Sequence, residues 1–206
     1  MIITSLNEYN KKVAIDHIIQ VEGDYVDNNN DRGGKTRYGI TEATAKEYKQ
    51  LWSKHNFNGD MKTLPYALAF EIYDIGWWTK LYLDDIVKVH PLIADRLLDM
   101  GINGGRSSGV TMLQRILNVF NKQGTLYPDL VVDGGMGPTT VKALKTAVAA
   151  RGDAAALNIV LNMLYLQGAF YITLAERDVK QETFSYGWAN RVKDANLNVC
   201  KFFYGK

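Results

Sequence analysis

Apolar residues recur at helical spacing through most of the chain. The clearest stripes run through residues 91–103 and 110–120, where apolar side chains return every three or four positions. Such spacing is typical of helices that bury one face. Thr41 is a good N-cap, and Pro91 and Pro138 suit the first position of a helix. We therefore expect a mainly α protein, with helices up to residue 22 and over residues 42–53, 65–82, 91–103, 110–120, 138–151, 154–175 and 182–203.

The first helix leads into a stretch with a different pattern. Ser5 and Glu8 form a capping box that predicts the helix start, and Gly23 predicts its end. Residues 27–34 are rich in the Asn, Asp and Gly that favour tight turns. Residues at alternate positions then fit a short strand, namely Thr36, Tyr38 and Ile40. The pattern predicts an α+β arrangement in which a helical body carries a small β-hairpin after the first helix.

Glu22 is the residue of this stretch that is best placed for chemistry. Ile15, Ile18 and Ile19 form an apolar stripe along the first helix, and Glu22 is the next position on that stripe. We expect the stripe to be buried, which would hold the carboxylate at the edge of the core. Partial desolvation favours the protonated form of a carboxyl group, and a general acid needs that form near neutral pH. Asp31 follows in the loop as a second carboxylate.

The same stretch resembles a known enzyme family. The string E-G-x-Y-V at residues 22–26, followed by D-x-G-G-x-T-x-Y-G-I-T at residues 31–41, is similar to glycoside hydrolase family 108. Members of this family are N-acetylmuramidases, often phage endolysins, and the resemblance implies a lysozyme-like fold. Similar motifs recur toward the C-terminus, so the resemblance covers nearly the whole chain. Asp24 and Arg32 depart from the pattern, because Gly and Pro are expected there.

The resemblance implies catalytic roles for three residues. Glu22 would protonate the leaving glycosidic oxygen. Asp31 would stabilise the oxocarbenium-like transition state, and Thr36 would hold the attacking water while Asp31 accepts its proton. This inverting scheme needs carboxyl groups roughly 6.5–9.5 Å apart, whereas a retaining scheme needs about 5–5.5 Å, and the sequence leaves both open. Asp24 and Asp27 remain rivals for the role of Asp31.

A saccharide cleft also needs side chains that bind sugar rings. Tyr38 and Trp78 are the aromatic candidates, although Trp78 could equally pack in the core, as aromatic residues at helical spacing usually do. Asn103 is a candidate donor to an N-acetyl or hydroxyl group, or else a residue that shapes a turn. Asp99 is expected to be structural, paired with a core arginine such as Arg96.

The C-terminal part carries a second motif. Residues 133–140, D-G-G-M-G-P-T-T, contain strong turn signals and resemble peptidoglycan-binding modules. Asp133 and Thr140 can equally serve to cap the loop and helix ends. We divide the chain into a lysozyme-like catalytic region, residues 1–120, and a peptidoglycan-binding-like helical region, residues 121–206, packed on the catalytic body.

Composition narrows the possible functions. The chain has 206 residues, of which 47% are hydrophobic, and a formal charge of +2, which gives no electrostatic footprint for nucleic-acid binding. No His or Cys spacing suggests a metal site, and we expect no cofactor. Cys200 is the single cysteine, which suits folding in a reducing cytosol. Residues 154–175 are uncharged and long enough to span a membrane, but Asn158, Asn162 and Gln167 favour a buried central helix.

The expected reaction is cleavage of the β-1,4 bond between N-acetylmuramic acid and N-acetylglucosamine. Charges interrupt the apolar runs at the N-terminus, so no signal peptide is expected. The resemblance implies a monomer made in the host cytoplasm that reaches the periplasmic cell wall through a holin and lyses the host. Its partner would be peptidoglycan, with no nucleic acid and no stable membrane insertion. Two alternatives remain: a lytic transglycosylase that needs Glu22 alone, or a non-catalytic wall-binding phage protein.

Overall fold

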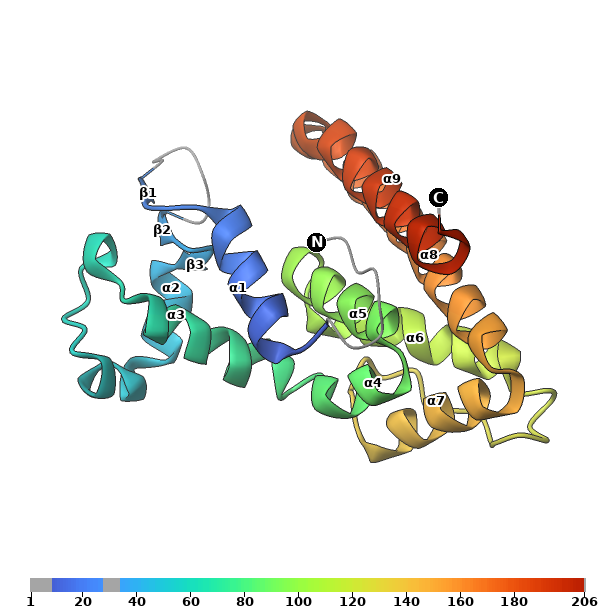
Figure 1. Ribbon diagram of the computed structural model, residues 1–206. Helices are drawn as coiled ribbons and strands as arrows, with labels where there is room; N and C mark the ends of the chain where they lie inside the picture. The colour runs from blue at the N-terminus through green and yellow to red at the C-terminus, as the bar shows by residue number, and fades with distance from the viewer. Residues whose placement is uncertain (1–8, 28–33, 206) are drawn as a thin grey trace. The chain divides into compact units, whose positions relative to one another are not determined.

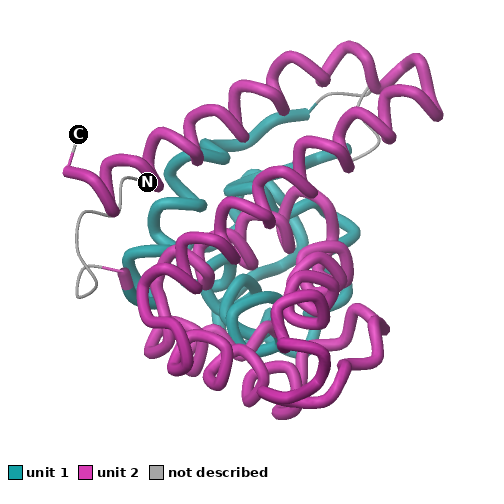
Figure 2. The backbone as a smooth tube through the Cα atoms, turned by 90° about the vertical axis from the view of Figure 1, so that its right-hand side faces the viewer, with its two compact units in different colours: residues 1, 10–80 teal, residues 2–9, 81–206 magenta. Residues whose placement is uncertain are grey.

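The chain forms two compact units. The structure is a computed structural model that describes residues 9–27 and 34–205 (Figure 1). Residues 10–80 form unit 1 and residues 81–205 form unit 2 (Figure 2). Tyr9 also belongs to unit 2, and its side chain is buried. The chain therefore enters unit 1 from unit 2 and returns to unit 2 after Lys80.

Unit 1 combines a long first helix, a small sheet and several short helices. Its elements are α1 (Lys11–Glu22), β1 (Val26–Asp27), β2 (Lys35–Arg37), β3 (Ile40–Thr41), α2 (Glu42–Glu47), the 3₁₀ helices η1 (Lys49–Leu51), η2 (Ser53–His55) and η3 (Met61–Thr63), α3 (Tyr66–Tyr73) and the π-helix η4 (Asp74–Trp78). The predicted capping box at Ser5 and Glu8 lies outside the described residues. Asn10 caps α1, since its side-chain oxygen accepts a hydrogen bond from the Val13 amide at 3.1 Å.

The sheet follows α1 directly. Its strands are antiparallel in the order β1-β2-β3, with Val26 opposite Thr36 and Arg37 opposite Ile40. The predicted hairpin is therefore confirmed, and β3 adds a third strand to it. Thr41 ends β3 and caps α2 as predicted, because its hydroxyl oxygen accepts from the Thr44 amide at 3.1 Å.

The core of unit 1 lies between α1 and α3. Buried aliphatic side chains from both helices meet there, including Ile15, Ile19, Leu68 and Ile72. The helix expected over residues 65–82 differs from the prediction. It changes at Asp74 into a π-helix, in which the Thr79 amide donates to the Asp74 carbonyl at 2.8 Å. The left-handed backbone of Tyr82, with φ of 55°, then separates it from the next helix.

Unit 2 is a helical bundle. Its elements are α4 (Leu83–Val89), α5 (Pro91–Asn103), α6 (Arg106–Phe120), α7 (Pro138–Arg151), α8 (Asp153–Arg177), the 3₁₀ helix η5 (Val179–Gln181) and α9 (Glu182–Tyr204). The starts predicted at Pro91 and Pro138 are confirmed, whereas α6 begins four residues before the expected Val110. With 73% of the structure helical and one small antiparallel sheet, the predicted mainly α fold class is confirmed.

α8 is the central helix of unit 2. It packs against α5, α6, α7 and α9 and buries Ile159, Val160, Met163 and Leu164. By length and composition α8 is also apolar enough to cross a membrane, the one such helix in the described ranges. Its contacts with four neighbouring helices agree with the interpretation of residues 154–175 as a core helix.

The buried side chain of Gln114 in α6 forms hydrogen bonds with the loop before α7. The amide nitrogen of Gln114 donates to Asp133 Oδ1 at 2.9 Å and to the Gly135 carbonyl at 3.1 Å, and its oxygen accepts from the Gly134 amide at 3.0 Å. The same amide nitrogen lies 3.4 Å from the Thr140 hydroxyl oxygen. The residues of the D-G-G motif thus have the structural role that was weighed for Asp133 and Thr140.

Candidate active site

Glu22 is the last residue of α1. Gly23 ends the helix with a left-handed φ of 78°, a value that glycine adopts without a steric cost. The chain then returns through the sheet, and the Tyr38 amide donates to the Gly23 carbonyl at 3.1 Å. The end of α1 is thereby joined to the turn between β2 and β3. The predicted end of the helix at Gly23 is confirmed, whereas the single strand predicted through Thr36, Tyr38 and Ile40 is wrong, because the chain turns at Tyr38 and Gly39 between β2 and β3.

Gly39 brings the backbone of this turn against Glu22. Its φ is 74°, and a methyl group added at Gly39 would lie 2.8 Å from Cγ of Glu22 and closer still to the Tyr73 hydroxyl oxygen. Real Cβ atoms do not approach other atoms so closely, so any side chain here would displace Glu22 or Tyr73. Gly39 therefore makes room for the two side chains that meet at the end of α1.

Tyr73 supports the same turn from α3. Its side chain is 2% exposed, and its hydroxyl donates to the Tyr38 carbonyl at 3.1 Å. Burial raises the pKa of Tyr73 well above its usual range, and the nearby Glu22 carboxylate raises it further. Tyr73 therefore stays protonated and remains a hydrogen-bond donor at any physiological pH.

The carboxylate of Glu22 is open to solvent. The expected apolar stripe is only partly buried: Ile15 and Ile19 are covered, Ile18 is intermediate, and Glu22 is exposed. The prediction that the protein core desolvates Glu22 is therefore wrong, because the buried part of the stripe ends at Ile19, one turn before the end of the helix. Its aliphatic part rests against Gly39, and its carboxylate is accessible to a ligand.

Tyr38 and Thr36 lie on the strand side of this site. Tyr38 has a left-handed φ of 55°, and its ring lies edge-on to Tyr66 with centroids 6.0 Å apart. The Arg37 guanidinium lies 4.8 Å from the Tyr38 ring centre. Thr36 lies in β2, and its hydroxyl donates to the Gly34 carbonyl at 3.2 Å. Both residues are half-buried, and their roles toward a substrate stay predictions.

The second carboxylate cannot be placed, because Asp31 lies outside the described residues. Its rivals are engaged in local contacts. Asp24 accepts from the Tyr25 amide at 2.8 Å and pairs with Arg37 at 2.9 Å; the amide first and the guanidinium next lower the pKa of Asp24. Asp27 accepts from the Tyr25 hydroxyl at 3.0 Å. These contacts give Asp24 and Asp27 structural roles in the sheet.

Trp78 is not available to stack on a sugar. Its side chain is 1% exposed and lies at the end of the π-helix among the largest fully buried side chains. Its candidacy as an exposed cleft residue is therefore wrong, because the π-helical turn directs the indole into the interior. The core position weighed for Trp78 is the observed one.

Asn103 ends α5 and is exposed. Its side-chain amide nitrogen donates to the Asp99 carbonyl at 2.8 Å. Asn103 lies in the helix and does not form a left-handed turn, and its amide is already engaged in a hydrogen bond. Its role as a saccharide donor stays a prediction.

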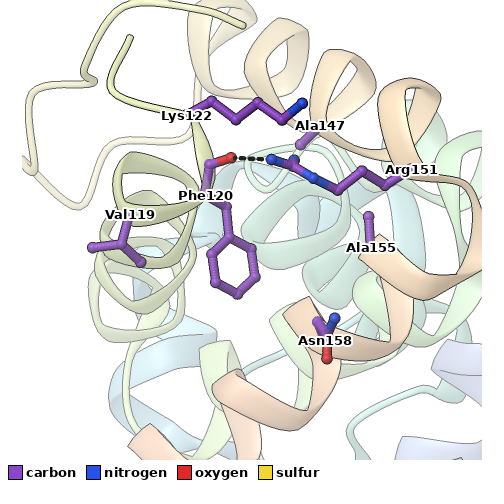
Figure 3. A pocket seen from close by; sticks show the side chains of 7 residues that line it. All are labelled: Val119, Phe120, Lys122, Ala147, Arg151, Ala155 and Asn158. Carbon is purple, nitrogen blue, oxygen red and sulfur yellow. Dashed lines mark hydrogen bonds between the residues drawn. The ribbon is translucent and has the colours of Figure 1, made fainter. Parts of the chain in front are cut away.

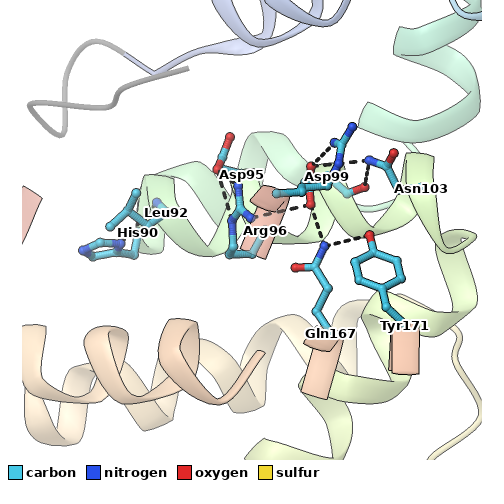
Figure 4. Close-up of polar contacts among 9 residues, drawn as sticks. His90, Leu92, Asp95, Arg96, Asp99, Asn103, Gln167 and Tyr171 are labelled. Atoms are coloured by element: carbon cyan, nitrogen blue, oxygen red, sulfur yellow. Dashed lines mark hydrogen bonds and ion pairs between the residues drawn. The ribbon is translucent and has the colours of Figure 1, made fainter. Parts of the chain in front are cut away.

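Asp99 is the centre of a buried polar cluster in unit 2 (Figure 4). It pairs with Arg191 at 2.8 Å and with Arg96 at 3.5 Å, and it accepts from the Gln167 amide at 2.9 Å. Burial alone would raise the pKa of Asp99, but the two guanidinium groups and the amide outweigh it and lower the pKa. The expected structural pairing of Asp99 with Arg96 is confirmed, and Arg191 joins it from α9.

The sequence did not predict two residues of the site, Gly39 and Tyr73. Gly39 lies against the stem of Glu22, and the Tyr73 hydroxyl lies beside Gly39, where the Glu22 charge raises the pKa of Tyr73. The adjacent Tyr-Gly-Ile-Thr string was a visible signal for Gly39, whereas the pairing with Tyr73 joins residues 34 positions apart and needs the fold. In the described ranges no group of three His, Cys, Asp or Glu side chains could hold a metal ion.

Comparison with known proteins identifies both parts of the chain. Residues 15–105 match the family model for glycosyl hydrolase 108. Residues 108–193 match that for a predicted peptidoglycan domain. Residues 15–105 are thus similar to the glycosyl hydrolase 108 family. This match includes Glu22, Gly39 and Tyr73, and the two matches together indicate a glycosidase whose substrate partner is peptidoglycan.

The fold has a relative among solved structures. The structure of Brucella abortus SagA aligns over 94% of this chain and 95% of that chain, with 25% sequence identity and a TM-score of 0.65. The alignment thus extends over both units of the chain. No curated protein sequence matches the chain.

Proposed function

We propose that this protein is an N-acetylmuramidase that uses Glu22 as its general acid. It cleaves the β-1,4 bond between N-acetylmuramic acid and N-acetylglucosamine, and Glu22 protonates the leaving oxygen. The observation that carries this proposal is the placement of Glu22. Its side chain is exposed at the end of α1, and its stem lies against Gly39.

Exposure of the free carboxylate is compatible with acid catalysis. A polysaccharide bound over the end of α1 would exclude water from Glu22, and a drier surrounding favours the protonated form. Gly39 limits the positions of the Glu22 side chain before substrate arrives, and Tyr73 supports the turn that carries Gly39, which lowers the entropic cost of aligning the acid with the scissile bond. Bound substrate would thus shield a Glu22 side chain that is exposed to solvent in the free protein.

The water-activating half of the reaction belongs to Asp31 and Thr36 in this proposal. Thr36 lies on β2, the strand that leads directly into the turn that contacts Glu22, which supports a place near the reacting bond. Asp31 would accept the proton of the attacking water in an inverting reaction, or attack the sugar itself in a retaining one. Tyr38, with its half-buried ring, would line the cleft beside them.

The proposed biological role is that of a phage endolysin. The protein would be made in the host cytoplasm, reach the periplasmic wall through a holin, act there as a monomer and cause lysis. The resemblance of the Glu22 string to phage muramidases supports this role, and so does the peptidoglycan-domain match over residues 108–193.

Hydrolysis of purified sacculi tests the enzymatic proposal. Turbidity would be followed with wild type, Glu22→Gln and Glu47→Gln, with mass spectrometry of the released products. Glu47 is an exposed glutamate at the end of α2 and serves as the matched control. Loss of a general acid lowers rates by about 100-fold or more, so Glu22→Gln should be nearly inactive and Glu47→Gln normal.

Each outcome has a distinct meaning. Reducing-end muropeptides released by wild type and not by Glu22→Gln would support the muramidase and the acid. Products with 1,6-anhydromuramic ends would instead make the protein a lytic transglycosylase. Full activity of Glu22→Gln would overturn the assignment of Glu22.

A further inference from the structure

A cavity of about 260 Å³ opens on the surface of unit 2 (Figure 3). It lies where the end of α6, the loop after it, the end of α7 and the start of α8 come together. Its lining residues are Val119, Phe120, Lys122, Ala147, Arg151, Ala155 and Asn158. All seven fall within the region that matches the peptidoglycan-domain family.

The charged groups of this cavity are both cations. Lys122 and Arg151 line it, and its lining contains no carboxylate. Neither cation forms an ion pair within the described ranges, whereas Arg37, Arg96 and Arg191 do. Two unpaired cations at one cavity favour an anionic ligand.

A hydrogen bond orients the Arg151 guanidinium, and the backbone turn that carries Lys122 is braced. One guanidinium nitrogen of Arg151 donates to the Phe120 carbonyl at 3.0 Å, which fixes the plane of the group across the cavity (Figure 3). Lys122 has a left-handed φ of 54° in a turn that buried Asn121 braces. The Asn121 side chain accepts from the Gly124 amide at 3.0 Å and donates to Asp129 at 2.6 Å. Such support is typical of a formed binding site.

The rest of the lining selects a small, partly apolar ligand. The Phe120 ring and the methyl groups of Ala147 and Ala155 offer an apolar surface, and the Asn158 amide lies on the other side of the cavity (Figure 3). A ligand that suits all of them has a carboxylate, a methyl group and a peptide amide. The C-terminal alanine of a short peptide has these three features.

We propose that this cavity binds the carboxylate end of a peptidoglycan stem peptide. Lys122 and Arg151 bind the terminal carboxylate, the alanine methyl group packs on Phe120 and Ala155, and Asn158 bonds to the peptide group. This inference deepens the proposed function, since it assumes that the protein acts on peptidoglycan. It gives the C-terminal part a role that differs from catalysis: it holds the wall while Glu22 cleaves the glycan.

Calorimetric titration with a synthetic tetrapeptide, L-Ala-γ-D-Glu-meso-diaminopimelate-D-Ala, tests the proposal. The full chain would be compared with Lys122→Gln, Arg151→Gln and the control Lys142→Gln, an exposed lysine of α7 outside the cavity. A charge-assisted hydrogen bond contributes enough that each cavity variant should bind about tenfold more weakly. Lys142→Gln should bind like wild type, and the C-terminal amide of the peptide should bind at least tenfold more weakly.

The contrary results are equally specific. Absence of binding at millimolar peptide, equal binding of the amide form, or normal binding by both cavity variants would overturn the proposal. Displacement of the peptide by an equal concentration of inorganic phosphate would also overturn it, since the cavity would then be a general anion site. Because the peptide contains no glycosidic bond, Glu22→Gln should bind it normally. A failed peptide titration with active enzyme therefore refutes this inference alone, and peptide binding without hydrolysis refutes the muramidase alone.

Discussion

At the scale of single residues, the site depends on a position that has no side chain. Gly39 lets the backbone touch both the stem of Glu22 and the hydroxyl of Tyr73. Catalysis is sensitive to such placement, because an acid displaced by about 1 Å can lose two orders of magnitude in rate. In the proposed mechanism, the placement of the Glu22 carboxylate therefore depends on Gly39.

We expect Gly39→Ala to lower the rate of sacculus hydrolysis at least tenfold. The new methyl group would displace Glu22 or Tyr73, and alanine at φ of 74° costs about 1 kcal/mol or more in backbone strain. Gly34→Ala is the matched control, because Gly34 also has a positive φ, 60°, but has open space around it. Both variants should lose similar stability in urea, while Gly39→Ala alone loses activity. Equal activity of the two variants would contradict the role of Gly39.

At the scale of elements, the join between α6 and α7 depends on Gln114. This side chain is 2% exposed and bonds to Asp133, Gly134 and Gly135 across the loop. Its bond, with that of the Gly135 amide, also lowers the pKa of Asp133. The D-G-G motif therefore connects the loop before α7 to α6 through hydrogen bonds.

Replacing Gln114 by alanine should destabilise the protein by about 2 kcal/mol, because the loop before α7 loses three hydrogen bonds to this buried side chain. Urea unfolding followed by circular dichroism would measure this loss. The neighbouring exposed Arg115→Ala is the control and should change the free energy of unfolding by about 0.5 kcal/mol or less. If the Gln114 and Arg115 variants unfold at the same urea concentration, the hydrogen bonds of Gln114 do not contribute to the free energy of unfolding.

At the scale of the whole molecule, the buried Asp99 cluster ties three helices of unit 2 together. Asp99 and Arg96 come from α5, Gln167 from α8 and Arg191 from α9. The folded state lowers the pKa of Asp99, so this carboxyl contributes stability above its unfolded pKa of about 3.9. That stability is lost as the pH falls below this value toward the lower folded pKa.

The melting temperature of Asp99→Asn should therefore depend less on pH than that of wild type. At pH 7 the variant should be less stable by about 3 kcal/mol, because Arg96 and Arg191 lose a buried partner. Between about pH 4 and pH 2 the gap should narrow, as wild type loses the ionised carboxylate. Thermal melts from pH 2 to pH 7 would measure both curves. Parallel curves would mean that Asp99 does not titrate with folding.

Local signals predicted much of the fold. Thr41, Pro91 and Pro138 mark helix starts by backbone rules that need no tertiary contact, and Gly23 marks the end of α1 in the same way. Glu22 was found because its helix and the following string are contiguous in the sequence.

The rest of the site depends on contacts between distant residues. Periodicity could not tell whether Trp78 faces solvent or the core, because the π-helix that turns it inward has no sequence signature. It also could not show that Glu22 extends past the buried stripe, or that Tyr73 meets Gly39. The cavity of unit 2 joins the ends of three helices, and no single stretch of sequence reveals such a meeting.

The path of the chain between the units has a consequence for folding. Tyr9 is buried in unit 2, close enough to Asp95 and Arg96 to feel their charges, and Leu81 re-enters the same unit. Both ends of unit 1 are thus anchored in its neighbour, as in an inserted domain. On the ribosome, residues 10–80 emerge before α5 does, whereas unit 2 cannot close over Tyr9 until α5 has emerged as well.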